Sequence, residues 1–176
     1  HPTATKPRVK VKVKVNLQQT PQNEIYLAPY DAKNIYMYMY SIEGTMPTAS
    51  NIPTKALFNA YYSGGMNAIV FQEMRETRGL AYSAGANYTT PSYKAQTEHF
   101  ITSIITQNDK LIECTNTFRQ IIDTLPQHKE AFEVARQTLK KNLASERINK
   151  FSLLNSYLKA QRQGLTKSPE EITYNA

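Results

Sequence analysis

The spacing of apolar residues changes its period along this chain, and that change constrains the fold more than any other feature. Alternation of apolar and polar residues, which is typical of strands, appears before residue 42 and returns after residue 80. Helical spacing fills the stretch between these two regions and the chain beyond about residue 108. The alternating segments are about 8–17, 24–29, 34–42, 80–90 and 95–106.

A pair of helical patterns lies in the middle of the chain. These patterns cover about 54–62 and 66–77, and Ser63-Gly64-Gly65 separates them. We interpret the two glycines as a helix break rather than a ligand-binding loop. Strands that cluster around a helix pair and are followed by helices predict an α+β domain of two layers, in which helices cover a mainly antiparallel sheet.

The last part of the chain is helical and closes on a well-formed helix start. Ser168 is a predicted N-cap, Pro169 occupies the first helical position, and Glu171 completes a capping box. The chain ends about two turns later, so we expect residues 1–176 to be a single domain truncated at its C-terminus. The helical patterns before it are about 111–125, capped by Asn108-Asp109, then 128–148 and 150–163.

Tyrosines recur at every second position of the segment 34–42. Tyr36, Tyr38 and Tyr40 share one face of this predicted strand, while Ile35 and Met39 share the other. Both faces are therefore largely apolar or aromatic. This pattern predicts a strand that is covered on both faces, with the tyrosines serving in packing.

A positive charge is concentrated in one alternating segment. The net charge of the 176 residues is +7, and much of the excess lies in RVKVKVKVN, residues 8–16. Lys10, Lys12 and Lys14 can bind nucleic acid, or they can protect a sheet edge from aggregation. Since no aromatic residues interleave with the lysines, we expect edge protection and no nucleic-acid partner. No apolar run has the length of a membrane span.

The residue types that carry most catalytic chemistry are scarce or badly placed. Cys114, the single cysteine, lies within an apolar helical stripe, which predicts a buried thiol. His1, His99 and His128 match no metal-binding spacing, and Glu98-His99 are neighbours on a strand that face opposite ways. We therefore expect no metal, no cofactor and no catalytic residue in this chain alone.

A specific resemblance appears between residues 63 and 88. The run SGGMNAIVFQEMRETRGLAYSAGANY resembles the C-terminal, non-zinc domain of the pitrilysin/insulinase (inverzincin) metallopeptidases, which include processing-peptidase-like proteins. The matching features are a glycine-rich stop, a helix ending in Phe71, the hydrophobic Met74 before Arg75-Glu76, and Gly79-Leu80-Ala81-Tyr82-Ser83 opening a strand. Ile69 departs from the family pattern, where a basic residue is common.

The resemblance implies a function shared with another domain. Members of the family enclose a peptide between homologous α+β domains, one of which binds zinc through an H-x-x-E-H motif and a distal glutamate. The other lacks metal and contacts the peptide substrate. This implies a zinc-bearing partner domain, in the same polypeptide or a separate subunit, and a part in a zinc metalloendopeptidase without catalysis by this chain alone. It also suggests a bacterial, extracytoplasmic (periplasmic) location.

Two residues carry the implied substrate contacts. Active relatives place an arginine and a tyrosine with six residues between them, which corresponds to Arg75 and Tyr82 here. A guanidinium can donate to backbone carbonyls, and a phenol can donate to a developing oxyanion. Residue types alone instead favour surface ion pairs, Arg75 with Glu76 or Arg78 with Glu73, beside a Tyr82 in the core. The surrounding motif favours substrate binding.

Two further functions remain open at this stage. The chain can be a non-catalytic structural homologue that keeps the peptidase fold without its chemistry. Alternatively, the segment 8–15 can make it a basic nucleic-acid-binding module. The spacing of Arg75 and Tyr82 argues against the first alternative, and the lack of nucleic-acid recognition motifs argues against the second.

Overall fold

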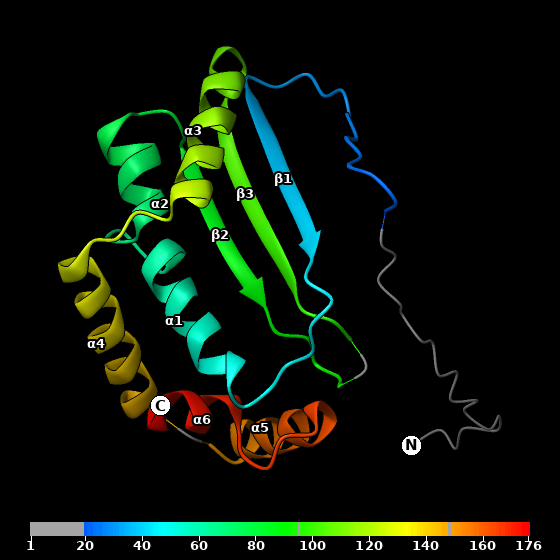
Figure 1. Ribbon diagram of the computed structural model, residues 1–176, viewed down its shortest axis with the longest axis vertical. Helices are drawn as coiled ribbons and strands as arrows, with labels where there is room; N and C mark the ends of the chain where they lie inside the picture. Colours follow the sequence, from blue (N-terminus) through cyan, green and yellow to red (C-terminus); the bar gives the residue numbers. More distant parts are fainter. Residues whose placement is uncertain (1–19, 95, 148) are drawn as a thin grey trace, which may run out of the picture.

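The computed structural model describes residues 20–94, 96–147 and 149–176. Its sheet has three strands in the order β1-β3-β2, and β3 pairs antiparallel with both neighbours. Figure 1 shows that the three strands run side by side with helices packed against them. The strands are β1 (Asn34–Ile42), β2 (Ser83–Thr89) and β3 (His99–Gln107).

The helices fall into a group that covers the sheet and a second group that packs outside it (Figure 1). Helix α1 (Asn51–Ser63) and the short α2 (Ile69–Phe71), which continues as the π-helix η1 (Gln72–Thr77), belong to the first group. The 3-10 turn η2 (Asn108–Lys110) and α3 (Leu111–Thr124) complete it. The remaining helices are α4 (Lys129–Ser145), α5 (Lys150–Gln163) and α6 (Pro169–Asn175). The predicted two-layer α+β fold is confirmed.

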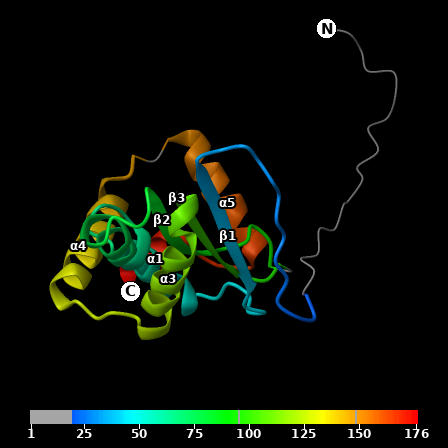
Figure 2. The ribbon, with the colours of Figure 1, turned by 90° about the horizontal axis from the view of Figure 1, so that it is seen from above.

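The hydrophobic core lies between the sheet and helices α1 to α3, which are seen end-on in Figure 2. Val70 of α2 and Met74 of η1 pack in one cluster with Phe118 of α3 and Ile104 of the central strand β3. All four side chains are at most 1% exposed. Cys114 is fully buried among them, and burial raises the pKa of its thiol. The prediction of a buried thiol is therefore confirmed.

The tyrosines of β1 are not packed as predicted. Tyr36, Tyr38 and Tyr40 are 62%, 69% and 49% exposed, whereas Met37 between them packs against the core. The helices that bury the sheet cover only the face to which Met37 belongs, and no described residues cover the tyrosine face to the same degree. The prediction that both faces of β1 are covered was wrong, because the sequence pattern does not show which face of a strand the helices pack against.

The predicted strand at 24–29 is also wrong. Residues 20–33 form no strand, and Ile25, Tyr26 and Leu27 are 84–89% exposed. Alternation favours an extended backbone, but a strand forms only where a neighbouring strand accepts its hydrogen bonds. The segment finds no such neighbour within the described ranges. The predicted strand at 8–17, with Lys10, Lys12 and Lys14, lies outside the described residues.

Two predicted helix caps differ in detail. Asn108 and Asp109 form the turn η2, and α3 begins after Lys110 without a side-chain cap. At α6, Ser168 Oγ accepts a hydrogen bond from the amide of Glu171 at 3.1 Å, as predicted. The Glu171 carboxylate, however, binds Lys167 Nζ at 2.7 Å instead of closing the capping box, because an ammonium is a stronger donor than a backbone amide.

Side chains of α1 satisfy the outer edge of β2. The Asn59 amide accepts from Tyr88 N and donates to Tyr88 O, both at 2.8 Å, and so imitates a neighbouring strand. Ser63 Oγ accepts from Ala86 N at 2.9 Å. Because these side chains occupy the edge, α1 closes one side of the sheet and β1 forms the other edge.

A buried carboxylate joins α1 to the lower end of the sheet. Glu98 is fully buried and accepts from Lys55 Nζ at 2.7 Å, Asn51 Nδ2 at 3.1 Å and Thr45 Oγ1 at 3.0 Å. Lys55 also reaches Glu43 at 2.6 Å. Burial by itself lowers the pKa of Lys55, but hydrogen bonds and charge from Glu43 and Glu98 raise it overall. The ammonium therefore stays charged and holds two carboxylates together.

We predict that Lys55→Met will destabilise the domain by about 3–5 kcal/mol, because it leaves Glu98 as a buried charge without its cation. Urea unfolding at neutral pH measures the change in the free energy of unfolding. The matched control is Arg119→Met, which removes an exposed ion pair with Asp123 and should cost less than about 0.5 kcal/mol. Equal stability of the two variants would contradict a structural role for the Lys55–Glu98 pair.

Candidate functional site

The junction between η1 and β2 is fixed by the backbone of one buried residue. Met74 is fully buried, and its carbonyl accepts hydrogen bonds from Leu80 N at 2.8 Å and Ala81 N at 3.2 Å. Gly79, which lies between Met74 and Leu80 in the chain, has φ +57°. This left-handed conformation costs glycine little. The chain therefore leaves the helix and enters the strand within a few residues, at a defined angle.

Tyr82 emerges from this junction toward solvent. Leu80 and Ala81 are each 5% exposed, whereas Tyr82 is 74% exposed. Its backbone is nevertheless held in place, since Tyr82 N donates to Ile105 O at 2.9 Å. The alternative that Tyr82 is a core residue is wrong. A rigid backbone with an exposed phenol is the arrangement expected of a side chain that contacts an external group.

Arg75 lies beside Tyr82 even though seven positions separate them in the chain. The Arg75 Cζ atom is 5.2 Å from the centroid of the Phe71 ring and 5.6 Å from that of Tyr82. Both distances are within the range of cation–π attraction. Arg75 belongs to the π-helix, a geometry that is often found at functional sites. The structure therefore brings the two predicted site residues together.

The surface ion pairs considered from the sequence also form, but they are weak. Arg75 Nε is 3.8 Å from Glu76 Oε1, and both side chains are about half exposed. Arg78 Nη2 is 3.5 Å from Glu73 Oε2. Ion pairs of this exposure contribute little, so neither prevents the Arg75 guanidinium from donating to another group.

A small cavity of about 280 Å³ adjoins Arg75 and Tyr82. It lies where β1 begins and β3 ends, because Asn34 pairs with Gln107 in the sheet register. Lys110 Nζ donates to Gly79 O at 3.3 Å and so projects along the cavity wall. The lining comprises Asn34, Arg75, Gly79, Leu80, Ala81, Tyr82, Thr106, Gln107 and Lys110.

Four of these lining residues lie outside the sequence motif, namely Thr106 and the three polar residues Asn34, Gln107 and Lys110. Asn34, Gln107 and Lys110 come from segments far from the 72–88 motif, and no local pattern marks them. The pairing of β2 with β3 brings the end of β3 beside Tyr82, and the pairing of β1 with β3 adds Asn34. Lys110 lies four positions after the predicted strand 95–106, and this position alone does not show which residues surround it.

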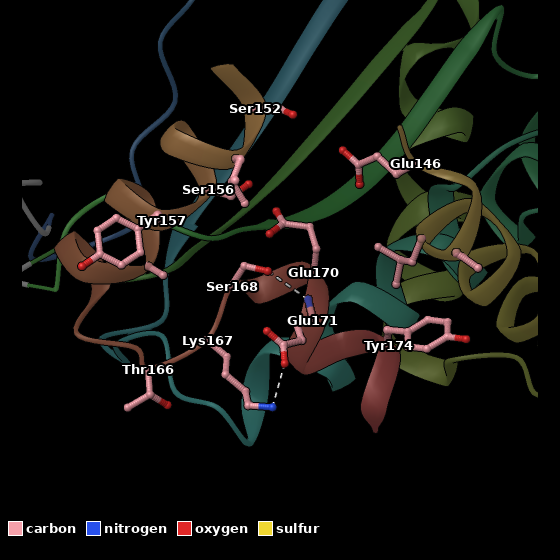
Figure 3. Close-up of a pocket in the computed structure, with 14 residues that line it drawn as sticks. Glu146, Ser152, Ser156, Tyr157, Thr166, Lys167, Ser168, Glu170, Glu171 and Tyr174 are labelled. Atoms are coloured by element: carbon pink, nitrogen blue, oxygen red, sulfur yellow. Dashed lines mark hydrogen bonds and ion pairs between the residues drawn. The ribbon is translucent and has the colours of Figure 1, made fainter. Parts of the chain in front are cut away.

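A larger cavity of about 670 Å³ lies among α4, α5 and α6, at the opposite end of the sheet (Figures 1 and 3). Its lining includes Tyr157, Ala160 and Tyr174, and several polar groups are already paired with one another. In Figure 3, Ser168 and Lys167 both bind Glu171. This cavity contains neither predicted site residue and is not connected with the Arg75–Tyr82 motif.

Metal-binding side chains do not cluster in the part of the chain that the structure describes. Among residues 20–94, 96–147 and 149–176, no three His, Cys, Asp or Glu side chains are placed to hold a metal ion. Glu98 faces Lys55 from the helix side, whereas His99 lies against Tyr40 on the other face, with ring centroids 4.8 Å apart. None of the described helices has the length and apolar character of a membrane span.

Comparison with known proteins identifies the family. A family model described as "Peptidase M16 inactive domain" matches residues 3–139. A crystal structure of a peptidase M16 inactive domain from Pseudomonas fluorescens has a similar fold, with a TM-score of 0.55 and 15% sequence identity. The match covers 83% of this chain and 32% of that chain, so this chain spans about a third of its length. No curated protein is similar enough to count as a match.

The family match extends over more than three quarters of the chain and includes the helix, the junction and the strand that carry Arg75 and Tyr82. The similar crystal structure agrees with the fold of the sheet and its covering helices. The resemblance found in the sequence is therefore confirmed, and the chain belongs to the family of peptidase M16 inactive domains.

Proposed function

We propose that this chain is the zinc-free partner domain of a zinc metallopeptidase, in which it closes the chamber and binds the peptide substrate. A homologous domain with an H-x-x-E-H motif, in the same polypeptide or another subunit, would carry out hydrolysis. The observation that carries this proposal is the exposed pair Arg75 and Tyr82, with the guanidinium 5.6 Å from the phenol ring. Family membership supports the non-catalytic part of the role.

Arg75 is suited to hold a peptide by its backbone. A guanidinium offers a planar fork of donors that can reach carbonyl oxygens without reading side chains. The rings of Phe71 and Tyr82 flank this group and restrict its motion before a peptide binds. Less conformational entropy is then lost on binding, which strengthens each hydrogen bond that forms.

Tyr82 adds a hydrogen-bond donor, and its hydrogen bond becomes stronger as negative charge develops on the peptide carbonyl. Its hydroxyl can donate to a carbonyl oxygen of the bound substrate. Among the described residues it has no hydrogen-bonded partner that would compete. When the carbonyl is attacked, its oxygen becomes negative and the hydrogen bond strengthens, which favours the transition state over the ground state.

The residues of this chain that the structure describes are not suited to hold zinc. No three His, Cys, Asp or Glu side chains in the described ranges are placed to coordinate one ion. The contribution proposed for this chain consists of binding and orienting a peptide. Orientation by itself can account for a large part of a rate enhancement.

We expect Arg75→Ala to weaken peptide binding in the assembled peptidase, because it removes the donors to the substrate backbone. Tyr82→Phe removes a single hydroxyl and should lower turnover by about 10²-fold if that group serves the oxyanion. Steady-state cleavage of a fluorogenic peptide measures both effects as changes in KM and kcat. The double variant need not show the product of the two effects, since both residues act on one bound peptide.

Arg78→Ala is the matched control, since it removes an exposed arginine whose partner is Glu73 and should change cleavage little. Thermal unfolding of each variant checks the fold. Because Tyr82 is 74% exposed, Tyr82→Phe should leave stability unchanged. Full cleavage activity in both the Arg75→Ala and the Tyr82→Phe variants would refute the proposed substrate contact and favour a purely structural domain.

We also predict that the purified chain holds no stoichiometric zinc and cleaves no peptide by itself, because its described side chains form no ligand cluster. Elemental analysis and the same fluorogenic assay, run without any partner protein, test this. One tightly held zinc per chain, together with hydrolysis that a chelator abolishes, would contradict this prediction.

A further inference from the structure

The cavity beside Arg75 and Tyr82 has an uneven charge. Arg75 and Lys110 are the two ionised side chains among its lining residues, and the lining includes no aspartate or glutamate. The amides of Asn34 and Gln107 and the Tyr82 hydroxyl add neutral groups that can donate hydrogen bonds. A cavity with two cations, several donors and no carboxylate is complementary to an anion.

We propose that this cavity selects peptides that carry a carboxylate next to the bound carbonyl, and that Lys110 is the specificity-determining residue. The proposal rests on the proposed function, since it assumes that Arg75 and Tyr82 hold the peptide backbone. Lys110 then binds the carboxylate of an adjacent aspartate or glutamate side chain, or of the peptide's own C-terminus.

Lys110 is placed to do this without rearrangement. Its ammonium is anchored by a single hydrogen bond of 3.3 Å to Gly79 O, in the turn that joins the helix of Arg75 to Tyr82. An ammonium has three donors, so two remain for a ligand. The carbonyl contact directs the side chain toward the turn at Gly79, and the residue as a whole is half-buried.

Acidic residues near the cavity do not neutralise it. Glu76 lies 3.8 Å from Arg75 Nε, a long and exposed contact that affects Arg75 rather than Lys110. Asp109 precedes Lys110 in the turn η2, but it is exposed and does not line the cavity. The two cations therefore face an incoming carboxylate without a built-in counter-ion among the lining residues.

Binding of short peptides to the 176-residue chain tests the proposal directly, without any partner. The probes are three N-acetylated tripeptides: one with a central aspartate and an amidated C-terminus, its asparagine counterpart, and the asparagine peptide with a free C-terminal carboxylate. Titrations followed by the backbone amide resonances of residues 79–82 and 106–110 give dissociation constants at that site. Compared with the neutral second peptide, the first tests a side-chain carboxylate and the third tests a terminal carboxylate.

At least one carboxylate peptide should bind about fivefold more tightly than the neutral peptide, as expected for a partly exposed ion pair. The preference should shrink as salt is raised. Lys110→Met should abolish the preference while leaving the neutral peptide's affinity unchanged, and Lys110→Arg should keep it. Lys140→Met removes the same charge from an exposed position on α4 and should retain the full preference.

The outcomes separate this inference from the function on which it rests. If all three peptides bind equally and Arg75→Ala weakens each of them, backbone binding stands and charge selection is overturned. A preference that survives in Lys110→Met would likewise overturn the role of Lys110. If no peptide perturbs these resonances at millimolar concentration, both the peptide-binding function and the selectivity are refuted. Thermal unfolding confirms that each variant is folded.

Discussion

The burial of Met74 and the two hydrogen bonds accepted by its carbonyl are the contacts on which the candidate site depends. Leu80 N and Ala81 N both donate to this oxygen, at 2.8 and 3.2 Å, so the helix end and the strand start are joined at one atom. The fully buried side chain anchors that atom in the core. Arg75 follows Met74 immediately, and Tyr82 follows Ala81 immediately. Their separation is therefore set by the core and not by their own contacts.

The backbone groups at the two edges of the sheet are satisfied differently, so the two edges differ in whether another strand can pair with them. At β2, Asn59 and Ser63 of α1 satisfy the backbone, so that edge is closed to another strand. At β1, the backbone edge adjoins a face on which Tyr36 and Tyr38 are more than 60% exposed. The two ends of the sheet differ as well. One is tied by the buried Glu98–Lys55 pair, and the other carries the cationic cavity.

The candidate binding residues and the buried ion pair thus lie at opposite ends of one small sheet. The lower end contains a buried carboxylate with three donors, an arrangement that is costly to disturb. At the upper end, exposed side chains project from a backbone that buried residues hold. Substitution of Arg75, Tyr82 or Lys110 removes few packing contacts, which is why their effects on binding can be measured apart from effects on folding.

The sequence by itself determined most of the described elements and pointed to Arg75 and Tyr82 as the candidate site residues. Period changes located β1, β3 and the helices to within a few residues, and the motif around Arg75 and Tyr82 indicated the family, which the match over residues 3–139 confirmed. These features are local: they depend on spacing along the chain, on glycine at the turns, and on residues within one turn of a helix end.

Only the tertiary structure decided which faces and edges are covered. The tyrosines of β1 and the residues 24–29 have the pattern of packed strands, yet they are exposed, because coverage depends on where helices and neighbouring strands lie. In the same way, Lys110 lies at the candidate site because β2 pairs with β3 and because its ammonium binds Gly79 O. A sequence pattern records that a residue can be buried or can bind. Its neighbours are set by contacts between segments far apart in the chain, and those contacts leave no local signal.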